Sequence, residues 1–473
     1  MDVTSEQRDR AVGAVLGMAV GDALGAGYEF EPCTPAAEIA MKGGGLGGFE
    51  AGEWTDDTSM AVPLLDVVAG GRDLLDPDTQ DEVVGRWLIW AEDPKDIGIN
   101  TSRVLNGAEQ PTAAWLRIRA SALFDGGARA AGNGSLMRTA PIVLGYLDDP
   151  EGLTAAARAY SHMTHGDPVA SDACVIWNHA QRHAILHGEF DLSPGVGWIP
   201  AERQGQWQTW IEQAERGRPE AFASSNQWVV GALQEAWAAI LSTPGAGPQH
   251  FEQTLRRIVA AGVDTDTVAA ICGGLLGARW GVSAIPLGWL RRLHGWPDDR
   301  TGQDLIELAS VAISGIPWPD SFYGFTPEGD STPVQLPHDP QVWIGDVFGL
   351  QQLPEDVDAV VSLCRLGRSE VPSAAVAPKD HVRVWLTDSA RPQENPHLEF
   401  VAQQAVTAIR DLRQEGRTVY LHCVHAQSRT PFIASLYAAQ AVGRPAMEVL
   451  DEVLSVLPGS RPNSAFLQVL AAN

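Results

Sequence analysis

Positive charge is scarce in this sequence. Its 33 lysines and arginines face 59 aspartates and glutamates, so the formal net charge of the 473 residues is −26. The excess is uneven: residues 1–334 carry 44 acids and 22 bases, whereas the remainder carries 15 acids and 11 bases. A surface of this sign repels phosphates and anionic lipids. The composition therefore argues against nucleic acid or a membrane as a partner.

Cysteines and long apolar segments are also few. The five cysteines follow no zinc-finger spacing, and their odd number does not suggest a disulfide framework. The first ten residues are charged, and no run of 18 or more uncharged apolar residues occurs. A signal peptide or a membrane span is therefore not expected. We expect a protein of the reducing cytoplasm.

The chain is long enough for two domains, and its hydrophobic pattern changes once. Up to residue 316, apolar residues recur at helical spacing without convincing strands between them, which predicts an all-α domain over 1–316. A long connection or an insertion is expected over about 187–226. Helices are expected near 8–24, 59–69, 81–91, 153–160, 171–186, 226–241, 251–260 and 267–280.

A proline-rich linker at 317–338 precedes a different pattern, in which short β-rich runs alternate with helical segments. This alternation predicts an α/β domain with a central sheet over 339–473. Strands are expected in VWIGDVF, VDAVVSLC, VRVWLTD and TVYLHC, and helices near 396–415, 430–442 and 446–456. The expected fold class is thus multidomain, an all-α domain followed by an α/β domain.

Two acidic motifs dominate the first domain. Trp-Thr-Asp-Asp-Thr begins at Trp54, and Val-Asp-Thr-Asp-Thr begins at Val263. A fold that brings them together gathers four carboxylates and several hydroxyls, which is unfavourable without a cation. Hard oxygen ligands favour Mg²⁺ or Mn²⁺, and carboxylates can bridge two ions. The sequence therefore predicts a binuclear metal site.

Four further motifs accompany the acidic pairs: GDALG at 21–25, YEF at 28–30, GNGSLMR at 132–138 and SHMTH at 161–165. In this order, the motifs resemble those of the ADP-ribosylglycohydrolase family, all-α hydrolases that remove ADP-ribose from modified molecules. The resemblance covers residues 1 to about 315. It implies that two Mg²⁺ or Mn²⁺ ions are held by Thr55, Asp56, Asp57, Asp264, Asp266 and Thr267.

The same resemblance implies roles on the substrate side. The ions would orient the ribose hydroxyls and polarise a water, while carboxylates that include Asp56 and Asp57 would stabilise oxocarbenium-like charge. Glu29 matches the family's mobile-loop glutamate, a candidate general acid/base or a metal-sensitive gate. Asp96 would recognise a guanidinium or, alternatively, cap a helix; His165 would face the substrate or bond at a helix entry. The loop expected to receive the diphosphate or the distal ribose contains Gly132, Asn133, Gly134 and Ser135.

The second domain carries a cysteine loop between a predicted strand and a predicted helix. The run HCVHAQSRT places five residues between Cys423 and Arg429. Backbone N–H groups of such a loop, together with the following helix N-terminus, form an anion cradle and favour a thiolate. Cys423 would then attack phosphorus while Arg429 holds phosphate oxygens. Thr430 would assist breakdown of the phosphocysteine, and Asp388 would be the general acid.

The last 135 or so residues thus resemble the cysteine-dependent dual-specificity protein phosphatases. The resemblance implies phosphate contacts for His425 and Ser428, and no cofactor in this domain. Two departures are visible, because Ala426 stands where the family usually has glycine, and His425 is unusual. Ala426 would have to adopt a backbone conformation that glycine favours. A weakened or specialised phosphatase, or a loop that only binds phosphate, are both open interpretations.

Together the two resemblances predict a bifunctional hydrolase. The first site would release ADP-ribose from an ADP-ribosylated protein, nucleobase or small molecule, and the second would hydrolyse a phosphorylated substrate. That substrate could be related to ADP-ribose, since covalent linkage raises the local concentration of a shared intermediate. The alternative is an ADP-ribose-sensing regulator whose only activity is that of a protein-tyrosine or dual-specificity phosphatase. The sequence does not identify the ADP-ribosyl linkage.

Overall fold

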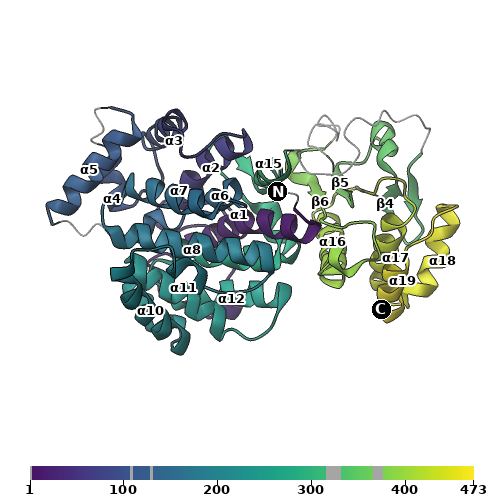
Figure 1. Ribbon diagram of the computed structural model, residues 1–473. Coiled ribbons are helices and arrows are strands. Elements are labelled where there is room, and N and C mark those ends of the chain that lie inside the picture. The colour runs from purple at the N-terminus through teal and green to yellow at the C-terminus, as the bar shows by residue number, and fades with distance from the viewer. Residues whose placement is uncertain (1–2, 107–109, 128–130, 316–331, 365, 367–375) are drawn as a thin grey trace. The chain divides into compact units, whose positions relative to one another are not determined.

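A computed structural model describes residues 3–106, 110–127, 131–315, 332–364, 366 and 376–473 (Figure 1). The chain divides into two compact units, each described here by itself. Unit 1 comprises Met1–Ile285 and Arg292–Pro317, and unit 2 comprises Pro286–Arg291 and Trp318–Asn473. Residues 317–331, the larger part of the predicted linker, lie outside the described residues.

Unit 1 is helical, as predicted, apart from a short hairpin of β1 (His294–Gly295) and β2 (Arg300–Thr301). Its α-helices are α1 (Ser5–Gly25), α2 (Asp56–Ala69), α3 (Pro77–Trp90), α4 (Ile99–Leu105), α5 (Ala113–Asp125), α6 (Ala140–Gly145), α7 (Pro150–His162), α8 (Pro168–His187), α9 (Ser193–Val196), α10 (Ala201–Arg216), α11 (Val229–Ser242), α12 (Gly247–Ala261), α13 (Thr265–Trp280) and α15 (Gly302–Ser314). The segment 187–226 is not a long connection, because α9 and α10 lie within it; the alternative of an insertion stays a prediction.

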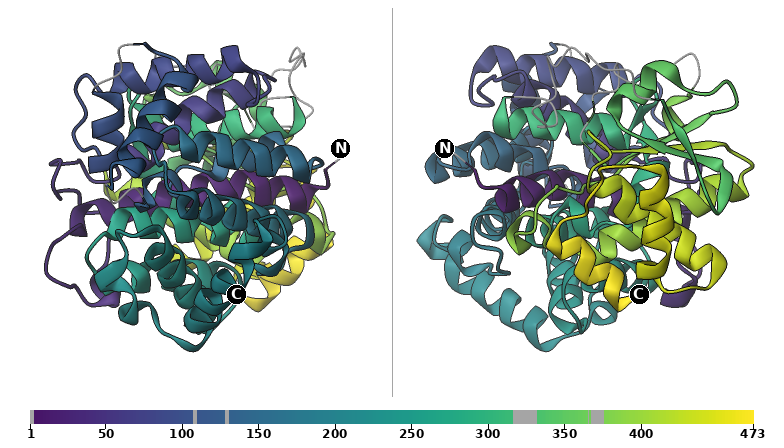
Figure 2. Two further views of the ribbon diagram at one scale, coloured as in Figure 1. Left: turned by 60° about the vertical axis from the view of Figure 1, so that its left-hand side comes forward. Right: turned by 90° about the vertical axis from the view of Figure 1, so that its right-hand side faces the viewer.

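Helix α1 crosses the interior of unit 1 with other helices around it (Figures 1 and 2). Glycines recur on α1 at every fourth position and let the backbone of α13 approach closely. A Cβ atom on Gly17 would lie 2.1 Å from Gly273 O, and one on Gly21 would lie 2.0 Å from Ala269 O. The helix Ser5–Tyr28 has the length and hydropathy of a membrane span, but its apolar window is entirely buried inside the protein.

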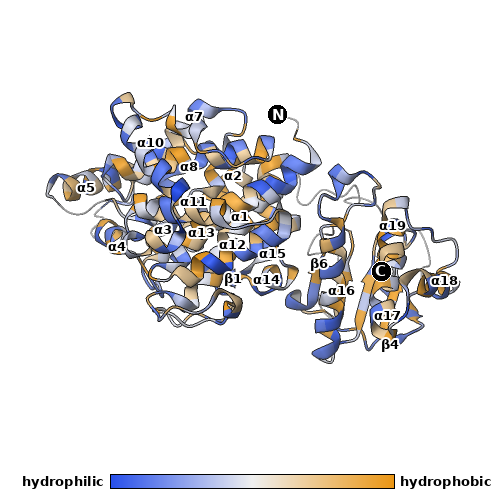
Figure 3. Ribbon diagram, turned by 90° about the horizontal axis from the view of Figure 1, so that it is seen from below, coloured by the Kyte–Doolittle hydropathy of each residue, from blue (hydrophilic) through white to orange (hydrophobic). Residues whose placement is uncertain are grey.

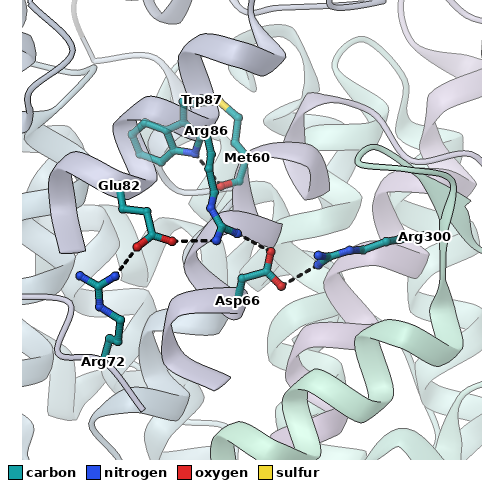
Figure 4. Close-up of polar contacts among 7 residues, drawn as sticks. All are labelled: Met60, Asp66, Arg72, Glu82, Arg86, Trp87 and Arg300. Atoms are coloured by element: carbon teal, nitrogen blue, oxygen red, sulfur yellow. Dashed lines mark hydrogen bonds and ion pairs between the residues drawn. The ribbon is translucent and has the colours of Figure 1, made fainter. Parts of the chain in front are cut away.

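Helix α2 is fixed by charged contacts at its C-terminal half (Figure 4). Asp66 accepts hydrogen bonds from Arg86 of α3, at 2.7 Å, and from Arg300 of β2, at 2.6 Å. Six residues earlier, Met60 O accepts a hydrogen bond of 2.9 Å from Trp87 Nε1. The side chain of Asp66 is only 11% exposed, so its two cationic partners are needed to compensate its charge. These contacts set the direction of α2, whose N-terminus carries the first acidic pair.

Unit 2 is an α/β unit with a five-stranded mixed sheet in the order β3-β4-β7-β5-β6. The strands β4, β7, β5 and β6 are parallel, and β3 pairs with β4 in antiparallel orientation at one edge. All four predicted strands and all three predicted helices are present; β3 and α19 were not predicted. The elements are β3 (Val334–Leu336), β4 (Asp339–Gly345), β5 (Ala359–Ser362), β6 (His381–Arg383), β7 (Val419–His422), α16 (Leu398–Gln414), α17 (Arg429–Val442), α18 (Ala446–Val456), α19 (Ser464–Ala472) and most of α14 (Leu287–Arg292).

The central strand β7 is covered on both faces. Val419 and Leu421 belong to a core shared with α16, α17, α18 and α19, whereas Tyr420 points into a second core with Val360 and Leu350. This alternation is what a strand with period two requires when both faces are buried. Figure 3 shows the resulting hydrophobic strands, and hydrophobic and hydrophilic residues mixed along α16. The C-terminal end of β7 then leads directly into the cysteine loop.

Candidate metal centre and cysteine loop

The first acidic pair lies at the N-terminus of α2, and Asp22 of α1 holds it in place. Thr55 N and Thr58 N donate to the two oxygens of Asp22 at 2.9 and 3.0 Å, and Thr58 Oγ1 donates to Asp22 Oδ2 at 2.6 Å. Asp22 is fully buried, and desolvation raises its pKa to about 6. Asp22 was quoted in a sequence motif but not predicted as a site residue. Its contact with a threonine 33 residues away reveals this role.

The second acidic pair lies at the N-terminus of α13. Asp264 is the residue before the helix, and Val263 adopts a φ of +71°, a conformation that glycine favours. Asp264 Oδ2 accepts a hydrogen bond from Asn133 Nδ2 at 2.8 Å, and Asp266 Oδ1 accepts one from Thr267 N at 2.8 Å. Thr265 Oγ1 donates to Gly25 O at 2.9 Å, which ties this turn to the end of α1.

Glu29 meets the second pair just after α1. Carboxylate oxygens of Glu29, Asp264 and Asp266 all lie within 4.8 Å of one another, and the three residues are buried. Desolvation, and then the charge of Asp264, raise the pKa of Glu29 to about 9. Desolvation, and then the charge of Glu29, raise the pKa of Asp266 well above its usual value. Such a cluster is unfavourable as anions and is stabilised by protons or by a cation.

The first pair contributes to the same electrostatic field. Desolvation, followed by the charges of Asp96 and Asp22, raises the pKa of Asp56 to about 7. Asp57 is completely buried; desolvation first, and then Asp22, raise its pKa well above the usual value. Thr55 Oγ1 donates to Asp57 Oδ2 at 2.9 Å, but among the described residues Asp57 Oδ1 has no hydrogen-bond partner. This oxygen offers an acceptor for a ligand such as a cation.

Asp96 lies beside Asp56 and does not cap a helix. The residue before α4 is Gly98, whose N–H donates to Asp56 Oδ2 at 3.2 Å. Asp96 accepts a hydrogen bond of 2.8 Å from Ile97 N, and partial burial raises its pKa. Its charge also raises the pKa values of Glu29 and Asp56, after desolvation. The helix-capping alternative for Asp96 is therefore not what the structure contains.

The glycine-rich loop is anchored to the second acidic pair. Gly132 forms a bridge with Trp228, and Asn133 donates to Asn226 O as well as to Asp264, both at 2.8 Å. Ser135 is buried, and its hydroxyl accepts a hydrogen bond from Ser161 Oγ at 3.0 Å. The loop thus lies close to the acidic cluster, but the Ser135 side chain is directed inward, so its predicted substrate contact stays a prediction.

The ring of His165 packs against this loop. Its ring would lie within 3.5 Å of a Cβ atom on either Gly132 or Gly134, and its Nδ1 is 2.8 Å from Thr164 Oγ1. Burial, and then the charge of Arg138, lower the pKa of His165 to about 3, so it is neutral. Arg138 is buried, donates to Thr164 Oγ1 at 2.6 Å and lies 4.4 Å from the Trp87 ring. Arg138 ends the GNGSLMR motif but was not predicted as a site residue.

The cysteine loop of unit 2 connects β7 to α17. Cys423 directly follows β7 and is buried, and α17 begins at Arg429. Arg429 is buried as well, and its Nη1 donates to Leu363 O at 2.8 Å and to Leu386 O at 3.2 Å. The guanidinium therefore joins the segments that follow β5 and β6. Thr430 Oγ1 donates to Gly345 O at 3.1 Å; an action on the sulfur stays a prediction.

The two unusual residues of the loop differ in their surroundings. Ala426 has a φ of +51°, the left-handed conformation that the sequence comparison with glycine anticipated, and its carbonyl accepts a hydrogen bond from Ser460 Oγ at 2.7 Å. His425 is exposed, with its ring centroid 6.3 Å from that of Phe348. Ala426 is thus compatible with the loop at a conformational cost of about 1–2 kcal/mol.

Asp388 and Ser428 both hydrogen-bond to Asn463. Asp388 is exposed, and its Oδ1 accepts a hydrogen bond of 3.1 Å from Asn463 Nδ2. Ser428 Oγ accepts a hydrogen bond of 3.2 Å from the backbone N–H of Asn463.

His422, the residue before the cysteine, is fully buried, and desolvation lowers its pKa to about 4. His422 is therefore a neutral structural residue, bonded to Ser362 Oγ at 2.7 Å.

Comparisons with known proteins concern mainly unit 1. The profile of the ADP-ribosylglycohydrolase family matches residues 3–319. ADP-ribosylarginine hydrolase Tri1 of Pseudomonas putida (strain GB-1) is 31% identical over 323 residues, which cover 65% of this chain and 81% of that protein. ADP-ribosyl-[dinitrogen reductase] glycohydrolase of Rhodospirillum rubrum is 31% identical over 299 residues, covering 60% and 90% of the two chains.

Solved structures give a consistent result. An ADP-ribosylglycohydrolase-related protein complex aligns with a TM-score of 0.52 and 31% identity, over 66% of this chain and 99% of that chain. Human DUSP28 aligns over 29% of this chain and 93% of its own at 19% identity, with a TM-score of 0.24 that is too low to support an argument. Because the family profile spans most of the sequence, and the buried acidic cluster lies inside the matched region, the chain belongs to the ADP-ribosylglycohydrolase family.

Proposed function

We propose that unit 1 hydrolyses the N-glycosidic bond between ADP-ribose and an arginine side chain, with divalent metal in the acidic cluster. The observation that carries the proposal is the cluster of buried carboxylates from Glu29 and the start of α13. The acidic pair at the start of α2 belongs to the same electrostatic field, because desolvation first, and then charges that include Asp56, raise the pKa values of Glu29 and Asp266. The names of the relatives support ADP-ribosyl hydrolysis in general, and Tri1 supports arginine as the acceptor.

The donor set fits Mg²⁺ or Mn²⁺. It consists of carboxylate and hydroxyl oxygens, it includes the unpartnered Oδ1 of Asp57, and burial raises the pKa of its acids in the absence of a cation. When bound, such ions orient ribose hydroxyls and lower the pKa of a coordinated water. The residues that would hold them are Glu29, Thr55, Asp56, Asp57, Asp264, Asp266 and Thr267.

The surrounding residues would bind and orient the two ends of the substrate. The loop at 132–135 lies against the second acidic pair and would receive the diphosphate or the distal ribose. On the other side, the partly buried carboxylate of Asp96 would pair with the guanidinium of the arginine. Departure of that group leaves positive charge on the ribose, which the carboxylates of Asp56 and Asp57 would stabilise.

The test compares arginine-linked with serine-linked ADP-ribosyl peptides, in Mg²⁺ and in excess chelator, with release of ADP-ribose followed by mass spectrometry. We expect metal-dependent release from the arginine-linked peptide. Asp96→Asn should lower kcat/KM for that peptide by about 10- to 100-fold, the effect of losing one charged hydrogen bond. The matched control is Asp93→Asn, on the same loop and exposed, which should leave kcat/KM unchanged. Cleavage of the serine-linked peptide alone would contradict the proposed acceptor.

We further propose that unit 2 is a cysteine-dependent phosphatase that acts through a phosphocysteine. The specific support is the position of Cys423 at the C-terminal end of the central strand, with Arg429 buried at the start of the next helix. Turnover of an aryl phosphate by the wild-type protein, and its loss in Cys423→Ser, would support the proposal. Phosphate binding without turnover would instead favour a phosphate-binding module. Supplying ADP-ribose 1″-phosphate in the same assay tests for a shared substrate.

A further inference from the structure

A short segment near the C-terminus runs along the cysteine loop of unit 2. Residues 460–463 lie in the connection between α18, which ends at Val456, and α19, which begins at Ser464, and three of them bond to consecutive residues of the loop. Ser460 Oγ donates to Ala426 O at 2.7 Å, and Arg461 N donates to Gln427 O at 2.6 Å. The third bond is donated by the backbone N–H of the last residue of the segment to Ser428 Oγ at 3.2 Å. The segment therefore braces the side of the loop that follows Cys423.

The side chain of Asn463 makes two further sets of contacts, one with the N-terminus of α19 and one with Asp388. Its Oδ1 accepts hydrogen bonds from Ala465 N at 3.0 Å and Phe466 N at 3.1 Å, which caps α19. Phe466 is fully buried and stacks on Phe432 of α17 with ring centroids 4.5 Å apart. With Oδ1 fixed in this way, Nδ2 is directed at Asp388 Oδ1, at 3.1 Å.

The backbone on both sides of Asp388 is bonded to the side chain of Asn395. Thr387 N donates to Asn395 Oδ1 at 2.9 Å, and Asn395 Nδ2 donates to Thr387 O at 2.9 Å and to Ser389 O at 3.1 Å. These bonds set the main chain but do not touch the Asp388 carboxyl group. An exposed aspartate side chain samples several rotamers unless a partner selects one. Among the described residues, the side chain that hydrogen-bonds to this carboxyl group is Asn463.

We infer that Asn463 is a positioning residue that holds the Asp388 carboxyl group over the cysteine loop for proton donation. The inference rests on the proposed phosphatase. In that reaction the Cys423 thiolate forms an S–P bond as the P–O bond to the leaving group breaks, and the proton of Asp388 passes to the leaving oxygen. Water then displaces the sulfur, and its proton returns to Asp388. Asn463 acts on both proton transfers by fixing the donor oxygen.

The role is tested by the dependence of kcat/KM on the leaving group. A poor leaving group such as phenol needs the proton, whereas difluoromethylumbelliferone leaves readily as an anion. Asn463→Ser keeps a helix-capping oxygen but removes the Nδ2 donor. We expect this variant to lose about 10-fold or more in kcat/KM on phenyl phosphate, and less than about 2-fold on difluoromethylumbelliferyl phosphate. Asp388→Asn should show the same selectivity with a larger loss.

Ser460→Ala is the matched control, since it removes a brace from the same segment without touching Asp388. It should affect both substrates equally. Thermal melting of each variant checks that the fold is retained, and Asn463→Asp provides a second variant with an intact cap. Equal losses on both substrates in Asn463→Ser would overturn the positioning role while leaving the phosphatase intact. No Cys423-dependent turnover by the wild type would overturn both.

Discussion

Metal binding to unit 1 should release protons, in a number set by the buried acids. At pH 7, a carboxyl group with a pKa of about 9 is about 99% protonated, and one with a pKa of about 7 is about half protonated. Glu29 and Asp56 are these two groups. Metal ligands have to be ionised. Occupation of the cluster at pH 7 should therefore release about 1.5 protons from this pair.

Titration calorimetry with Mn²⁺ in buffers of different ionisation enthalpy measures the total number of protons released, which includes those of this pair and of the other acids with raised pKa, such as Asp57 and Asp266. The slope of the apparent binding enthalpy against the buffer ionisation enthalpy equals the protons released. Glu29→Gln should lower the slope by about one proton, because the variant has no proton to lose at that position. The exposed Glu50→Gln is the matched control and should leave the slope unchanged. Saturation with release of fewer than about 0.5 proton would refute the assignment of the cluster.

Three further predictions concern stability. The pKa of Asp56 in the fold lies above its unfolded value of 3.8. The metal-free protein should therefore lose about 4 kcal/mol of unfolding free energy from this group as the pH rises from about 4 to 7. Melting in chelator should show a Tm that falls over this pH range, and a pH-independent Tm would contradict the prediction. Val263→Gly should raise the free energy of unfolding in urea by up to about 1 kcal/mol, since it removes a left-handed β-branched residue; a destabilised variant would speak against strain. Gly21→Ala should lower Tm and cost about 1–3 kcal/mol of unfolding free energy, because the added Cβ meets Ala269 O. The control Gly85→Ala, whose Cβ would face open space on α3, should be neutral or stabilising. Similar effects at both positions would contradict the packing argument.

Local motifs made the positions of both candidate sites predictable, whereas the roles of their residues stay predictions. The Asp-Asp pair, the Asp-Thr-Asp-Thr run and the Cys423 loop each place their functional groups within a few residues, so sequence alone located them. Asp22 and Arg138 were not assigned because their contacts are distant along the chain. Asp22 bonds to Thr55 and Thr58, and Arg138 bonds to Thr164, 26 residues away. Such partners follow from the packing of helices, which a single sequence does not specify.

The missed elements had weaker signals. Helix α10 buries only Trp207, Ile211 and Ala214, and the proline and tryptophan content of its surroundings suggested a connection instead. The spacing of these three residues is helical, so a search for period alone would have found it. Strand β3 has three residues and lies at the sheet edge, where one row of hydrogen bonds is enough to define it. Short edge strands carry too few residues for an alternating pattern.

The close pairing of α1 with α13 has a consequence for the order of events during protein synthesis. The glycines of α1 are made first, but the backbone they fit against is not complete until residue 280 has left the ribosome. At 5–20 residues per second, this is an interval of roughly ten to fifty seconds. During that time α1 can pack only on helices that are made earlier, such as α2, α6 and α8, and Asp22 has none of its acidic neighbours on α13. The core of unit 1 is therefore completed late, when α1 from the start of the sequence packs against α13 from near its end.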